Sequence, residues 1–511
     1  MNARRIHFIG ISGIGMSAIA RVMAGLGYQI SGSDLRETPI TLALEKEGIT
    51  FYKGHLQSQI QNADLVVVSS AIPADNPEVL AARAKKIPVF QRAEMLGFLM
   101  KERFGIAVAG THGKTTTTSM IALILEKAGL DPTVVIGGEL NDFGTNAKLG
   151  KAQYLVAEAD ESDASLLHLL PKIAVLTSID ADVNPSSEAF APCQFDYHKT
   201  LKRVEEIFLE FLSRVPKNGN VVLCLDSPFT QKIAPQIDAP VMTYGIEEKA
   251  DLTARNILLK ETKSSFSLLF KGEFLGEIKL AVPGKHNILN ALGATGVSLS
   301  VGLPFSKIAQ ALESFHGVKR RFQIVGSPSN VLIVDDYAHN PSKIKATLSA
   351  AKSGWNCRVV AVFQPHRYTR TKLLQEEFRH AFLDADLLYV TDIYPAGEVP
   401  IAGVNAEKLA LEIKKAHPEK KVVFEPKQEN LIQLLLKEVK SGDMILTLGA
   451  GDIYRIGNRM QEILSKDEQN DQCSARGIRV DSSPSLTMNA KLKTDRPPAS
   501  ERINNQDLEE R

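Results

Sequence analysis

A chain of 511 residues is too long for one hydrophobic core and predicts about three domains. Its hydrophobic content of 44% and charged content of 23% are ordinary for a globular protein, and a net charge of +1 gives no electrostatic support for binding nucleic acid. No stretch approaches the ~20 apolar residues of a membrane-spanning helix. The four cysteines are scattered, without a disulfide or zinc pattern, so we expect reduced thiols, no membrane insertion and a cytoplasmic location.

The first region, residues 1–104, starts with a predicted strand, Ile6–Ile9, followed by the turn G-I-S-G-I-G-M-S and a helix. A second strand, Gln29–Ser31, leads to Asp34. A glycine-rich turn feeding a helix, with an acid further on, is typical of a Rossmann-type nucleotide site. The order G-x-x-G-x-G, rather than the dinucleotide order G-x-G-x-x-G, favours a diphosphate ligand other than NAD. A turn needed only for helix–strand packing is the alternative.

The second region, residues 105–322, opens with the apolar strand Ile106–Ala109 and the loop G-T-H-G-K-T-T, Gly110 to Thr116. The two glycines allow a tight loop, Lys114 supplies a cation, Thr115 supplies a hydroxyl suited to Mg²⁺, and a helix follows. Val108 stands where the strict P-loop pattern has glycine. The ordered arrival of strand, loop, lysine, hydroxyl and helix predicts a nucleoside triphosphate site, and a chance Gly-Lys-Thr is the alternative.

Two further features of this region bear on ligands. The strand Tyr154–Ala157 runs into E-A-D-E-S-D, where Glu158 and Glu161 are candidate Mg²⁺ ligands, unless the segment is a solvated acidic turn. The turn P-G-K-H-N enters a helix that carries polar side chains suited either to a purine edge or to capping. The segments 137–141 and 144–150 are rich in glycine and asparagine, and we expect loops there.

The third region, residues 323–466, alternates predicted strands with helical runs, which is typical of a βαβ domain. Polar residues follow each strand, where open α/β sheets bind ligands. From Asp467 to 511 the chain is polar and has no aromatic residue, so we expect disorder. The predicted strands are Val331–Val334, Val359–Phe363, Leu387–Thr391 and Met444–Leu448.

Taken together, the motifs resemble those of the Mur ligase family. The chain carries, in the family's order, G-x-x-G-x-G-M-S, S-G-S-D, G-T-H-G-K-T-T-T, A-E-A-D-E-S-D, P-G-x-H-N, D-D-Y-A-H-N-P, F-Q-P-H-R-Y-T-R and G-A-G-D-I. The resemblance covers roughly residues 5–460. It implies an α/β protein of three domains: a Rossmann-like domain for a UDP-sugar, a central P-loop ATPase domain, and a Rossmann-like C-terminal domain for the amino acid.

The resemblance also implies a reaction, in which ATP and Mg²⁺ drive amide formation between UDP-N-acetylmuramate and L-alanine in peptidoglycan precursor synthesis. The γ-phosphoryl group first activates the carboxylate as an acyl phosphate, and the alanine amine then displaces phosphate. Candidate catalytic residues are Lys114, Glu161, His339 and Arg367.

Binding roles follow from the same resemblance, residue by residue. ATP would contact the loop residues Gly110, Thr111, His112, Gly113, Lys114, Thr115 and Thr116, with His286, Asn287 and Asn290 at the adenine, Asp336 at the ribose and Arg321 near the phosphates. The UDP-sugar would contact Gly13, Gly15, Ser17, Asp34, Ser70 and Arg92. Alanine and the lactyl carboxylate would contact Tyr337, His339, Arg367 and Arg370, and Mg²⁺ would be held by Thr115, Glu158 and Glu161.

One motif departs from the family. After I-D-A-D the family continues with a histidine that binds a second Mg²⁺, but this chain has Val183 and an insertion from Asn184 to Phe195. His198, in the D-Y-H-K-T that follows, could take that role or be a surface histidine.

Three alternatives stay open. One is the ligase that attaches a recycled murein tripeptide to the same UDP-sugar, against which G-M-S and Q-P-H-R-Y-T-R favour alanine. The others are a catalytically weakened binder of nucleotide or UDP-sugar and, more distantly, an NAD oxidoreductase.

Overall fold

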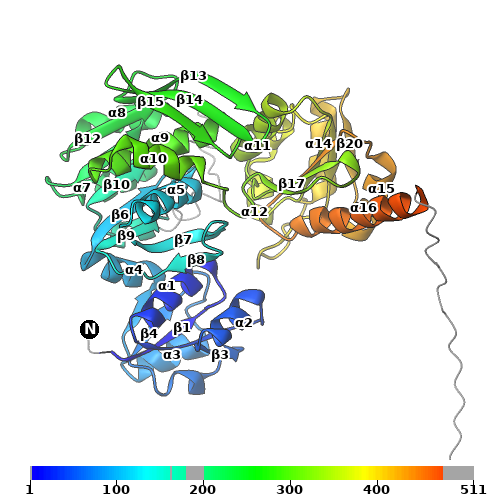
Figure 1. Ribbon diagram of the computed structural model, residues 1–511. Coiled ribbons are helices and arrows are strands. Elements are labelled where there is room, and N and C mark those ends of the chain that lie inside the picture. The colour runs from blue at the N-terminus through cyan, green and yellow to red at the C-terminus, as the bar shows by residue number, and fades with distance from the viewer. Residues whose placement is uncertain (1–2, 161–163, 180–200, 476–511) are drawn as a thin grey trace, which may run out of the picture. The chain divides into compact units, whose positions relative to one another are not determined.

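The computed structural model describes residues 3–160, 164–179 and 201–475. These form three sheets, each flanked by helices (Figure 1). Of the helices in those ranges, none has both the length and the apolar character needed to cross a membrane. The α/β class and the three-domain organisation predicted from the sequence are both confirmed.

The first sheet has five parallel strands in the order β3-β2-β1-β4-β5. Its central strands are buried apolar runs, which is typical of a parallel sheet covered on both faces. The elements are β1 (Arg5–Ile9), α1 (Ile14–Gly25), β2 (Gln29–Asp34), α2 (Pro39–Lys46), β3 (Thr50–Lys53), β4 (Leu65–Val68), α3 (Pro77–Ala84), β5 (Val89–Gln91) and α4 (Arg92–Lys101).

The second sheet has ten strands in the order β15-β14-β13-β12-β11-β10-β6-β9-β7-β8. Strands from β13 to β7 run parallel, whereas β14 and β15 extend the sheet with antiparallel pairing and β8 forms an antiparallel edge. Its strands are β6 (Phe104–Ala109), β7 (Thr133–Leu140), β8 (Thr145–Lys148), β9 (Tyr154–Glu158), β10 (Ile173–Leu176), β11 (Asn220–Cys224), β12 (Val241–Gly245), β13 (Leu252–Lys260), β14 (Lys263–Phe270) and β15 (Glu273–Leu280). Its helices are α5 (Lys114–Lys127), α7 (Leu201–Ser213), α8 (Pro228–Ile233), α9 (Lys285–Ser300) and α10 (Phe305–Glu313).

The third sheet has six strands in the order β16-β17-β21-β18-β19-β20, of which only β16 is antiparallel to its neighbour. Its strands are β16 (Gln323–Gly326), β17 (Leu332–Asp336), β18 (Val359–Phe363), β19 (Leu387–Val390), β20 (Lys421–Phe424) and β21 (Met444–Leu448). Its helices are α11 (Pro341–Gly354), α12 (Tyr368–Leu373), α13 (Gln375–Arg379), α14 (Ala406–Ala416), α15 (Gln428–Glu438) and α16 (Tyr454–Ala475).

Two expectations differ from the structure. The segments predicted as loops at 137–141 and 144–150 contain the end of β7 and all of β8, because the pairing of β7 with β8 and β9 overrides their glycine-rich composition. Helix α16 includes Asp467, at which the sequence predicts the folded part to end.

Candidate active site

The loop between β6 and α5 is built on two glycines whose backbones lie in the left-handed region. Gly110 has φ +128° and Gly113 has φ +78°. A Cβ atom on Gly110 would lie 2.2 Å from Thr177 Oγ1, and one on Gly113 would lie 2.3 Å from Asn290 Oδ1. Both positions therefore require glycine for conformation and for space.

The start of α5 presents the features of an anion site. Lys114 is the first residue of the helix, the first turn holds no acidic residue, and Lys114 Nζ donates to the Gly110 carbonyl at 2.5 Å. The loop is held by the segment after the neighbouring strand β10, since Thr111 N donates to the Ser178 carbonyl at 2.8 Å and His112 N to Ser178 Oγ at 3.2 Å. The free amides of a helix N-terminus and a nearby ammonium together favour phosphate.

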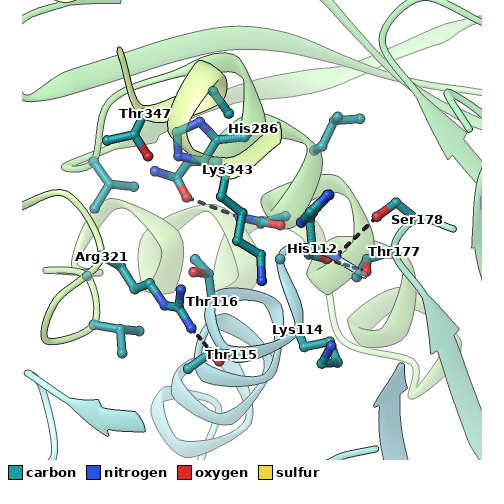
Figure 2. Close-up of a pocket in the computed structure, with 18 of the residues that line it drawn as sticks. His112, Lys114, Thr115, Thr116, Thr177, Ser178, His286, Arg321, Lys343 and Thr347 are labelled. Carbon is teal, nitrogen blue, oxygen red and sulfur yellow. Dashed lines mark hydrogen bonds between the residues drawn. The ribbon is translucent and has the colours of Figure 1, made fainter. Parts of the chain in front are cut away.

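A cavity of about 310 Å³ lies over this loop, which is within the usual range for a small-molecule site. The residues predicted to bind ATP line it, except Gly110, which packs against Thr177. Figure 2 shows Arg321 and Lys343 extending into the cavity above the first turn of α5. The predicted ATP-binding residues that line the cavity are Thr111, His112, Gly113, Lys114, Thr115, Thr116, His286, Asn287, Asn290, Arg321 and Asp336.

The wall formed by α9 is polar and already ordered. Asn287 Nδ2 donates to the Pro283 carbonyl at 2.7 Å, Asn290 Nδ2 donates to Asn287 Oδ1 at 3.1 Å, and Thr117 Oγ1 donates to Asn290 Oδ1 at 3.2 Å. No side chain caps α9, whose N-cap is Gly284. Burial lowers the pKa of His286 to about 4, so its imidazole is neutral near pH 7 and offers one donor and one acceptor.

Glu158 ends β9, close to the phosphate loop. Its Oε1 accepts from Gly137 N at 2.9 Å. Added Cβ atoms would lie 2.8 Å from Glu158 Oε2 at Gly137 and 3.0 Å from Thr115 Cγ2 at Gly138, so these glycines let β7 pass directly beside Glu158 and Thr115. In the described ranges no group of three or more His, Cys, Asp or Glu side chains could hold a metal ion. Glu161 and His198, the other predicted ligands, lie outside the described residues.

Arg321 and Asp336 bring charge to the cavity from beyond α10. Arg321 Nη2 donates to Thr115 Oγ1 at 3.5 Å, and its guanidinium lies 5.0 Å from the Tyr337 ring centroid. Asp336 accepts from Phe322 N and Ala338 N, each at 2.7 Å. Burial raises the pKa of Asp336, which the nearby Arg321 opposes.

The residues predicted for the amino acid form a separate cluster, outside the cavity lining. The ring of His339 lies 5.2 Å from that of Tyr337 and 5.7 Å from that of His366, and Arg370 Nη1 donates to His366 Nδ1 at 2.8 Å. Burial, with the charges of Arg370 and then Lys343, lowers the pKa of His339 well below its usual value. Because His339 Nδ1–H donates to the Tyr337 carbonyl at 2.7 Å, Nε2 carries the lone pair.

Arg367 and Arg370 differ in their surroundings. Arg370 is buried, whereas Arg367 is partly exposed with φ +70°, and its Nη1 lies 3.9 Å from Glu398 Oε1. His366 belongs to the same Q-P-H-R-Y-T-R motif but was not predicted as a site residue, and burial lowers its pKa to about 3. The His366 ring stacks on that of Tyr394, with 5.6 Å between the ring centroids.

The residues predicted for the UDP-sugar lie around the glycine-rich turn. Gly13 is the N-cap of α1, and the Arg92 side chain lies so close to Gly15 that an added Cβ would be 3.3 Å from Arg92 Cδ. Asp34 Oδ2 accepts from Ser12 N at 3.1 Å, which fastens the turn to the end of β2. Arg92 Nη2 also lies 3.5 Å from Asp160 Oδ2, just after β9.

The two predicted serines are placed differently from each other. Ser17 is fully buried, donates to the Ile14 carbonyl at 2.9 Å and accepts from Asn146 Nδ2 at 3.2 Å, so it contributes to packing between α1 and β8. Ser70 is exposed after β4.

Sequence analysis missed two residues at the start of α11. Ser342 Oγ lies 3.2 Å from His112 Nε2, and Lys343 lines the cavity (Figure 2). Both follow directly on D-D-Y-A-H-N-P, so a search of the first helical turn after that motif would have found them.

Comparison with known proteins gives one consistent result. Three family models match in order: "Mur ligase family, catalytic domain" over residues 5–104, "Mur ligase middle domain" over 108–298, and "Mur ligase, glutamate ligase domain" over 320–451. The chain is 50% identical over 463 residues to a UDP-N-acetylmuramate–L-alanine ligase from Geotalea uraniireducens, covering 91% of this chain and 98% of that protein. It is 51% identical to the same-named ligase from Geotalea daltonii, covering 90% and 98%.

Solved structures of Mur ligases are also similar to this chain. A UDP-N-acetylmuramate–alanine ligase from Thermotoga maritima superposes with a TM-score of 0.76 at 30% identity, covering 91% of this chain and 99% of that one. A murein peptide ligase from Psychrobacter arcticus superposes with a TM-score of 0.67 at 25% identity, covering 90% and 98%.

Proposed function

The chain belongs to the Mur ligase family, and from this premise we propose that it joins L-alanine to UDP-N-acetylmuramate at the expense of ATP. The observation that carries the proposal is an identity of about half over nearly the full length to ligases named for this reaction. The product is the amide that begins the peptide of a peptidoglycan precursor. The cytoplasm, where ATP is available, is the proposed location.

Each domain has a part in this proposal. Residues 1–104 bind the UDP-sugar, residues 105–322 bind ATP, and residues 323–466 bind the amino acid, with 467–511 as a tail. The cavity over the phosphate loop takes ATP, with the neutral His286 and the two asparagines of α9 at the adenine. Asp336, which also lines the cavity, binds the ribose hydroxyls in this proposal.

The chemistry begins with an unreactive carboxylate, so the γ-phosphoryl group is first transferred to the lactyl carboxylate, releasing ADP. The amine of alanine then attacks the acyl carbon, and phosphate leaves from the tetrahedral intermediate. Lys114, Arg321 and the amides at the start of α5 neutralise charge on the phosphoryl oxygens during both steps.

Alanine is held by the cluster around His339. The side chains of Arg367 and Arg370 suit carboxylates, since the guanidinium is a planar donor fork. His339 Nε2 is available as an acceptor for the ammonium group, because Nδ1–H is used by the Tyr337 carbonyl.

Mg²⁺ fits the oxygen donors at the end of β9 and the start of α5. The Thr115 hydroxyl and the Glu158 carboxylate are hard oxygen ligands, and Gly137 and Gly138 let β7 pass directly beside both residues. When bound there, Mg²⁺ would neutralise charge on the ATP phosphates.

The test is a competition between two acceptors. The enzyme is incubated with ATP, Mg²⁺, UDP-N-acetylmuramate and equal amounts of L-alanine and the tripeptide L-alanyl-γ-D-glutamyl-meso-diaminopimelate, and the products are identified by mass. We expect only the alanine adduct. The tripeptide adduct alone would identify a recycling ligase, and substrate binding without either adduct would identify a catalytically weakened binder.

A further inference from the structure

A fully buried carboxylate in the N-terminal domain has no part in the chemistry described above. Glu78 lies in the first turn of α3, where the Asn76 side chain caps its amide at 2.9 Å. Its Oε1 accepts from His7 Nε2 at 2.8 Å. Its Oε2 accepts from His55 Nδ1 at 2.6 Å and from the Ser33 hydroxyl at 2.6 Å. One carboxylate therefore ties together β1, β2, α3 and the segment after β3.

The bonding keeps Glu78 ionised despite its burial. Burial alone would raise the pKa of Glu78, but the hydrogen bonds from His7, Ser33 and His55 and the charge of His7 bring it below the usual value. An ionised carboxylate accepts hydrogen bonds only, so all three neighbours point their donors at it.

Ser33 connects this carboxylate to the glycine-rich turn. The Ser33 carbonyl accepts from Gly10 N at 2.9 Å and from Ile11 N at 3.1 Å. The next residue, Asp34, accepts from Ser12 N. The backbone of the turn thus rests on the end of β2, and the Ser33 hydroxyl forms hydrogen bonds with the side chains of Glu78 and His55.

Ser31, on the same strand as Ser33, differs from it in its hydrogen-bond partners. Ser31 lies two residues earlier on β2, and its hydroxyl lies 2.9 Å from His7 Nδ1. Ser31 reaches Glu78 only through His7, because it meets the Nδ1 edge of the His7 ring whereas Glu78 meets the Nε2 edge. No hydrogen bond links the Ser31 side chain to the turn within the described part of the chain.

We propose that Glu78 is a positioning residue for the nucleotide-sugar site: by fixing the Ser33 and His55 side chains, it holds the turn Gly10–Gly13 in its binding geometry. The role of the turn in UDP-sugar binding rests on the proposed function. Glu78 itself, with no exposed surface, acts through Ser33 and not by touching the ligand.

Two matched variants test this, with the dissociation constant for UDP-N-acetylmuramate measured by calorimetry. Ser33→Ala should weaken binding about tenfold, the scale of one lost hydrogen bond to a charged group, whereas Ser31→Ala should change it less than about twofold. The KM for ATP should stay close to wild type in both variants, because a general loss of structure would alter it as well.

A double-mutant cycle then asks whether Glu78 acts through Ser33. Glu78→Gln should weaken UDP-sugar binding, and the double variant with Ser33→Ala should bind no more weakly than the worse single variant. Equal binding by Ser33→Ala and wild type, equal effects of the two serine variants, or effects in the double variant that multiply would each overturn the proposal. Failure of the wild-type protein to bind UDP-N-acetylmuramate would instead count against the proposed function.

Discussion

Gly113 of the phosphate loop lies against Asn290 of α9, so that a Cβ on the glycine would come within 2.3 Å of the Asn290 Oδ1 atom. The same oxygen accepts from Thr117 Oγ1 at 3.2 Å. The loop and the α9 wall of the cavity are therefore one packed unit, and any side chain at position 113 must displace that wall.

Gly113→Ala should raise the KM for ATP by at least about tenfold, because the methyl group displaces Asn290 from the cavity wall. Gly129→Ala is the matched control. Gly129 follows the other end of α5 with φ +83° and has nothing within 4 Å of an added Cβ, so it isolates the strain of the left-handed backbone, roughly 1–2 kcal/mol. An ATP KM for Gly113→Ala within twofold of the control would contradict the packing argument.

Lys114→Met should lower kcat by about 10²–10³, the scale for losing one preorganised group that stabilises transition-state charge. Binding of UDP-N-acetylmuramate should be retained, because the proposed UDP-sugar site belongs to another domain. Lys127, exposed in the last turn of the same helix, supplies the control variant Lys127→Met, which should be fully active. Joint loss of turnover and UDP-sugar binding in Lys114→Met would count against the domain assignment.

Thr115→Ala should raise the Mg²⁺ concentration needed for half-maximal activity by about tenfold, since a hard oxygen ligand is lost. Thr115→Ser keeps the hydroxyl and should restore the wild-type Mg²⁺ dependence. A Mg²⁺ titration of the three proteins at saturating ATP makes the comparison. If the alanine variant titrates like wild type, Thr115 is not a metal ligand.

His286 predicts a pH dependence of stability. Its folded-state pKa of about 4 lies below the ordinary value of 6.5, so the unfolded chain binds its proton first as the pH falls. The contribution of His286 is therefore complete above pH 6.5 and declines between 6.5 and about 4. Urea unfolding should be measured at pH 7.5, 6 and 5 for wild type and His286→Asn. As the pH falls, the free energy of unfolding of wild type should decrease relative to that of the variant. A constant difference would contradict the burial of His286.

The elements that sequence analysis located well are those with a strong local signal. Strands such as Ile106–Ala109, Val359–Phe363 and Met444–Leu448 are continuous apolar runs followed by polar turns, and the structure has strands there. Gly137 and Gly138 lie in a strand although the sequence predicts a loop there, because glycine is typical of loops. Their small size serves the approach of β7 to Glu158 and Thr115, which only tertiary pairing reveals.

The site residues also differ in how far the sequence alone could predict them. Residues 110–116 are contiguous and form one loop, so their grouping could be predicted from the sequence. The resemblance to the Mur ligase family added Arg321, Asp336 and the residues of α9 to the predicted ATP site. The contact of His112 with Ser342, 230 residues away, and that of Ser33 with Glu78 depend on how distant elements pack. No local pattern marks such pairs, because neither residue needs its partner to form its own helix or strand.

The most direct test of the central claim is phosphate release from ATP in the presence of Mg²⁺, with UDP-N-acetylmuramate and L-alanine supplied separately and together. We predict sustained release only when both are present, in a one-to-one ratio with the alanine adduct. Release that is independent of L-alanine, or no release from protein that still binds ATP, would contradict the assignment of this chain as an alanine-adding ligase.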